Sequence, residues 1–212
     1  MIRFRQVLLV ALVMCTAVGC ADRIEPPVPV TYLETDKLKD WSESHAQPYG
    51  IPERSLRAYS YAAVKVGEEK CELGWPTIAA IGAVVSHHGF VHGSKIQEDG
   101  TSTIPLRNVD IAPIAIVADT DQGRIDGTNE FDIPVGPLQI MPSRWEQFEA
   151  AAEPDTTPNP DSVDDSALVM ARQLCSFGNL KNPNGWDEAV KSISADPEFV
   201  KAVHEKATEY SR

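Results

Sequence analysis

The sequence has no cluster of basic residues, and this lack excludes two classes of partner. Nineteen Lys and Arg stand against 31 Asp and Glu in 212 residues, for a formal net charge of −12. Nucleic acids and anionic lipid head groups are both bound through local positive charge. The sequence therefore predicts no nucleic-acid partner, and any membrane attachment must come from another source.

The sequence also lacks an apolar run of the roughly 20 residues that a membrane-spanning helix needs. Its first residues instead follow the layout of a secretory signal peptide, with two arginines, an apolar run over 7–13 and small residues over 16–19. A short uncleaved membrane anchor is the alternative. We expect the protein to be exported.

The end of this segment, Ala17-Val18-Gly19-Cys20, resembles a bacterial lipobox. The resemblance implies that residues 1–19 are removed and that Cys20 carries the lipid anchor. Several acyl chains on one terminus bind a membrane far more firmly than one. We expect a lipoprotein on the outer face of the cytoplasmic membrane. An ordinary secreted protein, cut nearby, is the alternative.

Cysteines are few, and no CxxC or HExxH motif accompanies them. Such motifs carry most zinc and redox sites, so we predict no metal and no cofactor. With Cys15 in the signal peptide and Cys20 lipidated, Cys71 and Cys175 remain. In an oxidising compartment two remaining cysteines usually form a disulfide, which we expect here; two buried thiols are the alternative.

Composition and periodicity divide the exported chain into two parts. Residues 20–50 are rich in proline and charge, which predicts a flexible tether with room for a surface helix near 36–44. Residues 51–212 are predicted to form one mainly α domain with a loop-rich middle at 90–134. Its expected helices begin near residue 51 and cover 75–89, 142–151, 161–177, 184–194 and 197–210.

Two segments make the domain similar to a known family. Residues 75–89 read WPTIAAIGAVVSHHG, and residues 119–145 read DTDQGRIDGTNEFDIPVGPLQIMPSRW. Together with the cysteine pair, they resemble the actinobacterial lytic (murein) transglycosylases, whose pattern over the last part is VGPMQFIPSTW. The resemblance covers about residues 51–212 and implies a lysozyme-like helical fold.

The same resemblance implies a substrate and a reaction. Family members cut peptidoglycan glycan strands between N-acetylmuramic acid and N-acetylglucosamine without water. One glutamic acid protonates the glycosidic oxygen and then acts as base while the muramyl 6-hydroxyl closes on the anomeric carbon. This chemistry needs a carboxyl group that keeps its proton near neutral pH.

The sequence departs from the family where that acid belongs. The family pattern is close to AIGxVESxHG, whereas residues 80–89 read AIGAVVSHHG, so Val85 replaces the catalytic glutamate. The family's Tyr-Asn pair, which lines the cleft, is also missing, and Ile193 and Ser194 stand in its place. Two losses in one constellation predict a pseudoenzyme.

Four other positions correspond to the glycan-binding cleft of the family, namely Ser86, His88, Gln139 and Met141. The Gln139 amide both donates and accepts hydrogen bonds, which suits N-acetyl groups and hydroxyls. A backbone-capping role for Gln139 is the equal alternative. We expect Trp145 to lie in the core.

Other acidic and histidine residues offer alternatives to these interpretations. A relocated catalytic acid would come from His87, His88, Glu98, Asp99, Glu130 or Asp132, but misplacement by an ångström is costly in rate. The aspartates Asp119, Asp121 and Asp126 lack the spacing of a calcium-binding EF-hand, so we predict a turn-stabilising role.

The leading hypothesis is a catalytically inactive envelope lipoprotein that binds peptidoglycan glycan or a protein partner and regulates cell-wall assembly. Two rivals remain. The first is an active lytic transglycosylase with a relocated acid. The second is a protein-binding adaptor without affinity for glycan.

Overall fold

The computed structural model describes residues 33–212, so the predicted signal peptide, Cys20 and the first part of the predicted tether lie outside the described residues. Half of the elements' order is set before the middle of the chain: a 3₁₀-helix, three α-helices and a second 3₁₀-helix precede the loop-rich middle, and four α-helices follow it. The mainly α class is thus confirmed. None of the helices in this part of the chain is long and apolar enough to cross a membrane.

The first described elements are the 3₁₀-helix η1 (Glu34–Leu38) and helix α1 (Lys39–Tyr49), which ends at Gly50 in the left-handed conformation (φ 65°). Ala46 of α1 lies in the hydrophobic core. Asp36 of η1 accepts a hydrogen bond of 2.6 Å from Arg57 of the next helix. The predicted tether boundary at residue 50 is therefore too late, because residues 34–49 pack onto the domain.

The physical reason for this error is the partner of the charged residues. Arg57 has a side chain only 2% exposed, and a buried guanidinium needs carboxylate partners. Asp36 and Glu53 supply them. Charge in this segment therefore serves an interior ion pair, whereas composition alone predicts solvation.

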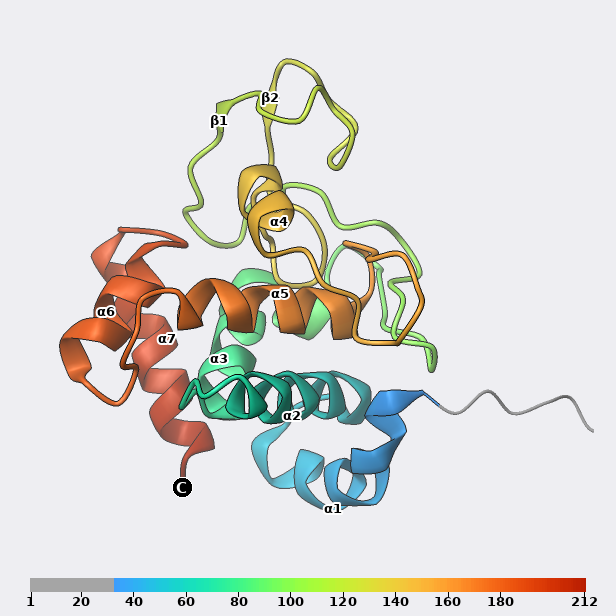
Figure 1. The fold of residues 1–212 in the computed structure, drawn as a ribbon, viewed down its shortest axis with the longest axis vertical. Coiled ribbons are helices and arrows are strands. Elements are labelled where there is room, and N and C mark those ends of the chain that lie inside the picture. Colours follow the sequence, from blue (N-terminus) through green and yellow to red (C-terminus); the bar gives the residue numbers. More distant parts are fainter. Residues whose placement is uncertain (1–32) are drawn as a thin grey trace, which may run out of the picture. The chain divides into compact units, whose positions relative to one another are not determined.

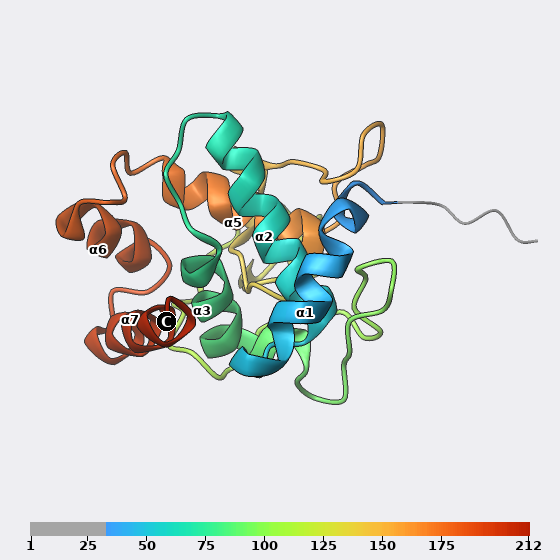
Figure 2. The same ribbon diagram turned by 90° about the horizontal axis from the view of Figure 1, so that it is seen from below.

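The core forms where helices α2 (Glu53–Glu68), α3 (Trp75–Ser86) and α5 (Val163–Cys175) pack together. Figure 2 shows α2 crossing over α5, with α1 on one side and α3 on the other. Helix α2 turns the helically spaced Leu56, Tyr59 and Val66 inward, all of them fully buried. The predicted first helix is confirmed.

Helix α3 has no charged residue, because it is covered from several sides. It contacts α2, α5 and the C-terminal helix α7 (Pro197–Tyr210). Gly82 lets α3 approach α2, since a Cβ atom at this position would overlap the hydroxyl of Tyr59. A glycine inside a helix is thus explained by close packing.

The later helices begin where capping residues predict. Ser162 caps α5, Asn182 caps α6 (Pro183–Lys191) and Asp196 caps α7, each by accepting a bond from a backbone N–H in the first turn. The short helix α4 (Pro142–Phe148) starts with proline at its first position. Trp145 of α4 is 2% exposed and lies in the core, as expected.

Residues 90–134 form the predicted loop-rich excursion, which we call the excursion below. Its regular structure within this range is a pair of two-residue antiparallel strands, β1 (Val117–Ala118) and β2 (Phe131–Asp132), and a few isolated bridges. Figure 1 shows the strand pair beyond α4, on the side away from α2.

The base of the excursion is tied to the helices by a buried ion pair. Arg54 of α2 donates a bond of 2.8 Å to Asp164 of α5 and another, of 2.9 Å, to the carbonyl oxygen of Glu98. Gly100 fits beside this pair, where a Cβ atom would overlap both side chains. The pair therefore positions the beginning of the excursion against α2 and α5.

A disulfide joins the ends of two core helices. Cys71 follows α2, Cys175 ends α5, and their Cα atoms lie 5.8 Å apart. The predicted pairing is confirmed. Because 104 residues separate the two cysteines, the bond restricts a long stretch of the unfolded chain.

We expect the double variant Cys71→Ser/Cys175→Ser to lose about 2–5 kcal/mol of unfolding free energy, because the unfolded chain regains its freedom. Urea unfolding of the purified protein measures the loss. Dithiothreitol should lower the midpoint of the unmodified protein to a similar value and leave the double variant unchanged. A double variant as stable as the oxidised protein would contradict the prediction.

Candidate functional site

The position that corresponds to the family's catalytic acid lies in the packed interior. Val85 occupies the last turn of α3, is 1% exposed and belongs to the hydrophobic core. Leu138, from the segment before α4, is buried in the same cluster. The side chain at this position is thus hydrocarbon surrounded by other side chains.

Ser86 fastens the end of α3 to that same segment. Its hydroxyl is fully buried, donates to the carbonyl oxygen of Pro137 and accepts a bond of 2.8 Å from the N–H of Gly89. The chain then turns through His87 and His88, both with positive φ, into the 3₁₀-helix η2 (His87–Gly89). Ser86 therefore caps a turn, and its oxygen is committed to the backbone.

His88 is held by tyrosines from two helices. Its Nδ1 lies 3.2 Å from the hydroxyl of Tyr59, and its Nε2 lies 3.4 Å from the hydroxyl of Tyr210. Ser55 of α2 donates to its backbone carbonyl. Burial lowers the pKa of His88 to about 4, with smaller contributions from His87 and Lys206. The ring is therefore neutral at pH 7 and lacks the extra proton of a general acid.

Gln139 makes the backbone contacts of the capping alternative. It is 3% exposed and has positive φ (48°). Its Oε1 accepts a bond of 2.8 Å from the N–H of Val109, and its Nε2 donates one of 2.8 Å to the carbonyl of Gly136. Met141, half-buried, precedes α4. The structure thus brings Ser86 and Gln139 to one segment, 135–140, and buries both.

The residues at the lost Tyr-Asn pair also contact the interior. Ile193 packs against the core, and the Ser194 hydroxyl donates a bond of 2.6 Å to the carbonyl of Pro113. Ala112 and Ile114 pack against the core on either side of that bond. Together with the bond from Val109 to Gln139, this contact ties residues 109–114 of the excursion across the region of the family's cleft.

The candidates for a relocated acid are exposed or already bonded. Glu98 and Glu130 are exposed, and Asp132 is buried but accepts a bond of 2.8 Å from the N–H of Thr120. Burial raises the pKa of Asp99, but bonds from the hydroxyl and N–H of Thr101 outweigh it, so the pKa lies below its usual value. A lowered pKa disfavours proton donation at neutral pH.

The aspartates of the excursion stabilise turns, in agreement with the sequence. Asp121 accepts a bond of 3.1 Å from the N–H of Gly123, and Asp126 accepts one of 2.8 Å from the N–H of Ile133. In the described part of the chain, one carboxylate group has the spacing to hold a cation, since Asp119, Asp121 and Asp132 each place an oxygen within 4.8 Å of the others. Asp132, rather than Asp126, completes this group.

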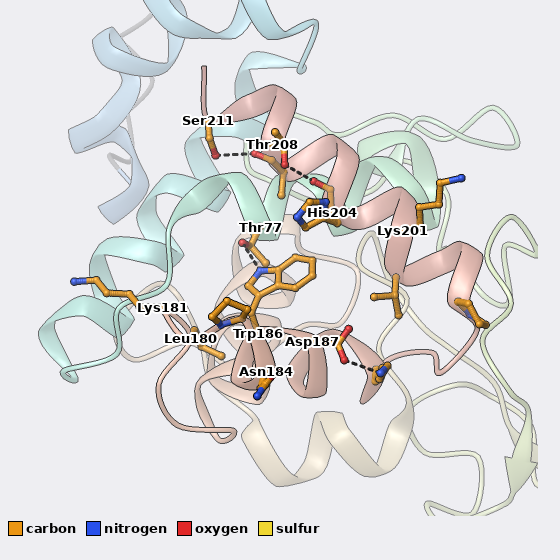
Figure 3. Close-up of a pocket in the computed structure, with 15 residues that line it drawn as sticks. Thr77, Leu180, Lys181, Asn184, Trp186, Asp187, Lys201, His204, Thr208 and Ser211 are labelled. Atoms are coloured by element: carbon orange, nitrogen blue, oxygen red, sulfur yellow. Dashed lines mark hydrogen bonds and ion pairs between the residues drawn. The ribbon is translucent and has the colours of Figure 1, made fainter.

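Two cavities lie near the ends of α3, and neither is lined by Val85, Ser86, Gln139 or Met141. One, of about 400 Å³, lies between the end of α3 and Tyr210. The other, of about 910 Å³, lies between α6 and α7 with Trp186 at its centre (Figure 3). Sequence reasoning missed Trp186, although a tryptophan near the start of an amphipathic surface helix is a usable signal.

In comparisons with protein-family models, with curated proteins and with solved structures, nothing matched the chain. The resemblance to lytic transglycosylases therefore depends on the two segments of the sequence and on the cysteine pair.

We expect Val85→Glu to destabilise the domain by about 3–5 kcal/mol at pH 7, because the carboxylate would be buried without a partner. Burial would raise its folded pKa above the unfolded value of about 4.3, so the loss should be small below that pH and grow as the pH rises. Chemical denaturation between pH 4 and pH 8 measures this trend.

The matched control is Val84→Glu, because Val84 is half-buried at the edge of a cavity on the same helix turn. It should cost clearly less at every pH. Equal losses at residues 84 and 85 would contradict the burial assigned to Val85.

We also expect His88 to make the domain sensitive to acid. Its folded pKa, about 4, lies below the unfolded value of 6.5, so the unfolded chain binds more protons between these two pH values. Its contribution is fully present above pH 6.5 and declines as the pH falls toward 4, by about 3 kcal/mol. Comparing the unfolding free energy of the unmodified protein with that of His88→Gln at pH 7 and pH 4 isolates this term. Parallel pH profiles would contradict it.

Proposed function

We propose that this protein is a non-catalytic relative of the lytic transglycosylases, with a lysozyme-like domain that binds peptidoglycan glycan strands without cutting them. Support comes from the two family-like segments, 75–89 and 119–145, and from the disulfide between Cys71 and Cys175. In this proposal Cys20 carries the lipid, and the protein stands on the outer face of the cytoplasmic membrane.

One observation carries the proposal: a buried valine stands where the reaction needs a proton donor. Val85 is 1% exposed, so neither a proton nor a glycosidic oxygen has access to its surroundings. General acid catalysis contributes about a hundred- to ten-thousand-fold to rate. The loss of this group alone would therefore leave any residual cleavage far below that of a functioning relative.

The rival with a relocated acid finds little support. The glutamates that it requires are exposed, and the side chains of Asp99 and Asp132 are engaged by threonines. A catalytic carboxyl group must lie within hydrogen-bond reach of its substrate proton, or one water away. Residues 109–114, tied down at Gln139 and Ser194, stand between the excursion's acids and such a position.

The protein-adaptor rival has one observation in its favour. In the described chain seven large apolar side chains are exposed, and five of them belong to the excursion: Ile104, Ile111, Ile116, Val117 and Phe131. Their dispersal over separate loops of the excursion, however, differs from the contiguous apolar patch that marks a stable protein interface. Glycan binding is therefore the better-supported function.

Co-sedimentation with insoluble, protein-free peptidoglycan tests the proposal. We expect the protein to be retained in the pellet, and retention to fall after Cys71→Ser/Cys175→Ser in dithiothreitol, because a loosened domain loses its binding surface. Serum albumin is the negative control. A protein that stays in the supernatant like albumin would contradict glycan binding and favour the adaptor.

A further inference from the structure

The cavity between α6 and α7 has a rigid aromatic centre. The indole N–H of Trp186 donates a bond of 3.1 Å to the hydroxyl of Thr77 on α3, which satisfies the only polar atom of the ring. His204 of α7 meets the indole edge-on, with ring centroids 5.7 Å apart. Figure 3 shows Trp186 between Thr77 and His204. The half-buried indole thus has a fixed orientation and a face available in the cavity.

The charge around this cavity is opposite to that of the chain. Its lining includes Lys181, Lys191 and Lys201 but only one carboxylate, Asp187. The whole chain has 31 acidic against 19 basic residues. The lysine side chains are 50–67% exposed, so their ammonium groups are able to exchange present partners such as Asp187 for a ligand. The cavity therefore favours an anion.

Polar side chains complete the rim. Thr208 and Ser211 donate their hydroxyl protons to backbone carbonyls of α7, which leaves the oxygens as acceptors turned to the cavity. Asn184 adds an amide from the first turn of α6. An aromatic face with a few convergent polar groups is the usual composition of a small-ligand site, and 910 Å³ lies within the usual size range.

We propose that this cavity is the glycan-binding site, and that its ligand is an acidic saccharide. A pyranose ring would lie on the face of Trp186, a carboxylate would pair with Lys191 or Lys201, and the rim would bind hydroxyl and N-acetyl groups. This inference rests on the proposed glycan-binding function. It locates the contact on α6 and α7, away from the buried residues Val85 and Gln139.

Fluorescence titration tests the site, because Trp186 reports on its own occupancy. The probe is a soluble muropeptide, a disaccharide of N-acetylglucosamine and N-acetylmuramic acid with free carboxylates. We expect it to change the emission of the unmodified protein and of a Trp145→Phe variant, and to leave Trp186→Phe unchanged. Neutral tetra-N-acetylchitotetraose should bind about tenfold more weakly, since it offers no carboxylate.

Two charge variants keep the test independent of folding. Lys191→Ala/Lys201→Ala should weaken muropeptide binding about tenfold. Lys39→Ala/Lys95→Ala, which removes the same charge from exposed positions elsewhere, should leave it unchanged. Circular dichroism verifies that each variant is folded.

Three outcomes would overturn the site. The first is equal muropeptide affinity in both lysine variants, and the second is a persistent emission change in a folded Trp186→Phe variant. The third is poly-L-glutamate binding as tightly as the muropeptide, which would exclude a saccharide. If these variants still sediment with peptidoglycan like the unmodified protein, the site fails while glycan binding stands; if the unmodified protein does not sediment, both fail.

Discussion

The rest of the structure depends on the way in which the end of α3 is fastened. Ser86 joins this end to residues 135–140, while Tyr59 and Tyr210 hold His88 from two helices. In an apolar interior each of these polar groups needs its partner, since an unpaired one costs about 1–3 kcal/mol. One junction thus positions α2, α3, α7 and the base of the excursion. The same bonds that give it stability also occupy the groups that a relative would use on substrate.

Most of the fold follows from local signals in the sequence. The apolar spacing of α2, the prolines and capping residues of α5 to α7 and the lack of period in the excursion all appear in the structure. The beginning of the domain does not follow from them. Composition treats Asp36 as a solvated charge, but it pairs with buried Arg57, 21 residues away, and only the folded chain brings these two together.

The candidate site divides in the same way. Motif comparison located Val85, Ser86, His88 and Gln139, and these positions do meet around α3 and residues 135–140. Their roles depended on partners far away in the sequence: Val109 for Gln139, and Pro113 for Ser194. No local pattern predicts such contacts, because loops of the excursion have no periodicity to fix where they cross. The cavity at Trp186 was missed for a similar reason, since α3, α6 and α7 build it jointly.

The central claim is that a buried hydrocarbon side chain, Val85, has replaced the acid and ended bond cleavage. Mass spectrometry of the soluble products after prolonged incubation with peptidoglycan tests it most directly, with an active muramidase to show that the glycan is accessible. The account predicts no 1,6-anhydromuropeptides above the level of a buffer control. Their release in proportion to protein and time, undiminished when Asp99 and Asp132 are the only changed residues, or abolished by either change, would equally contradict it.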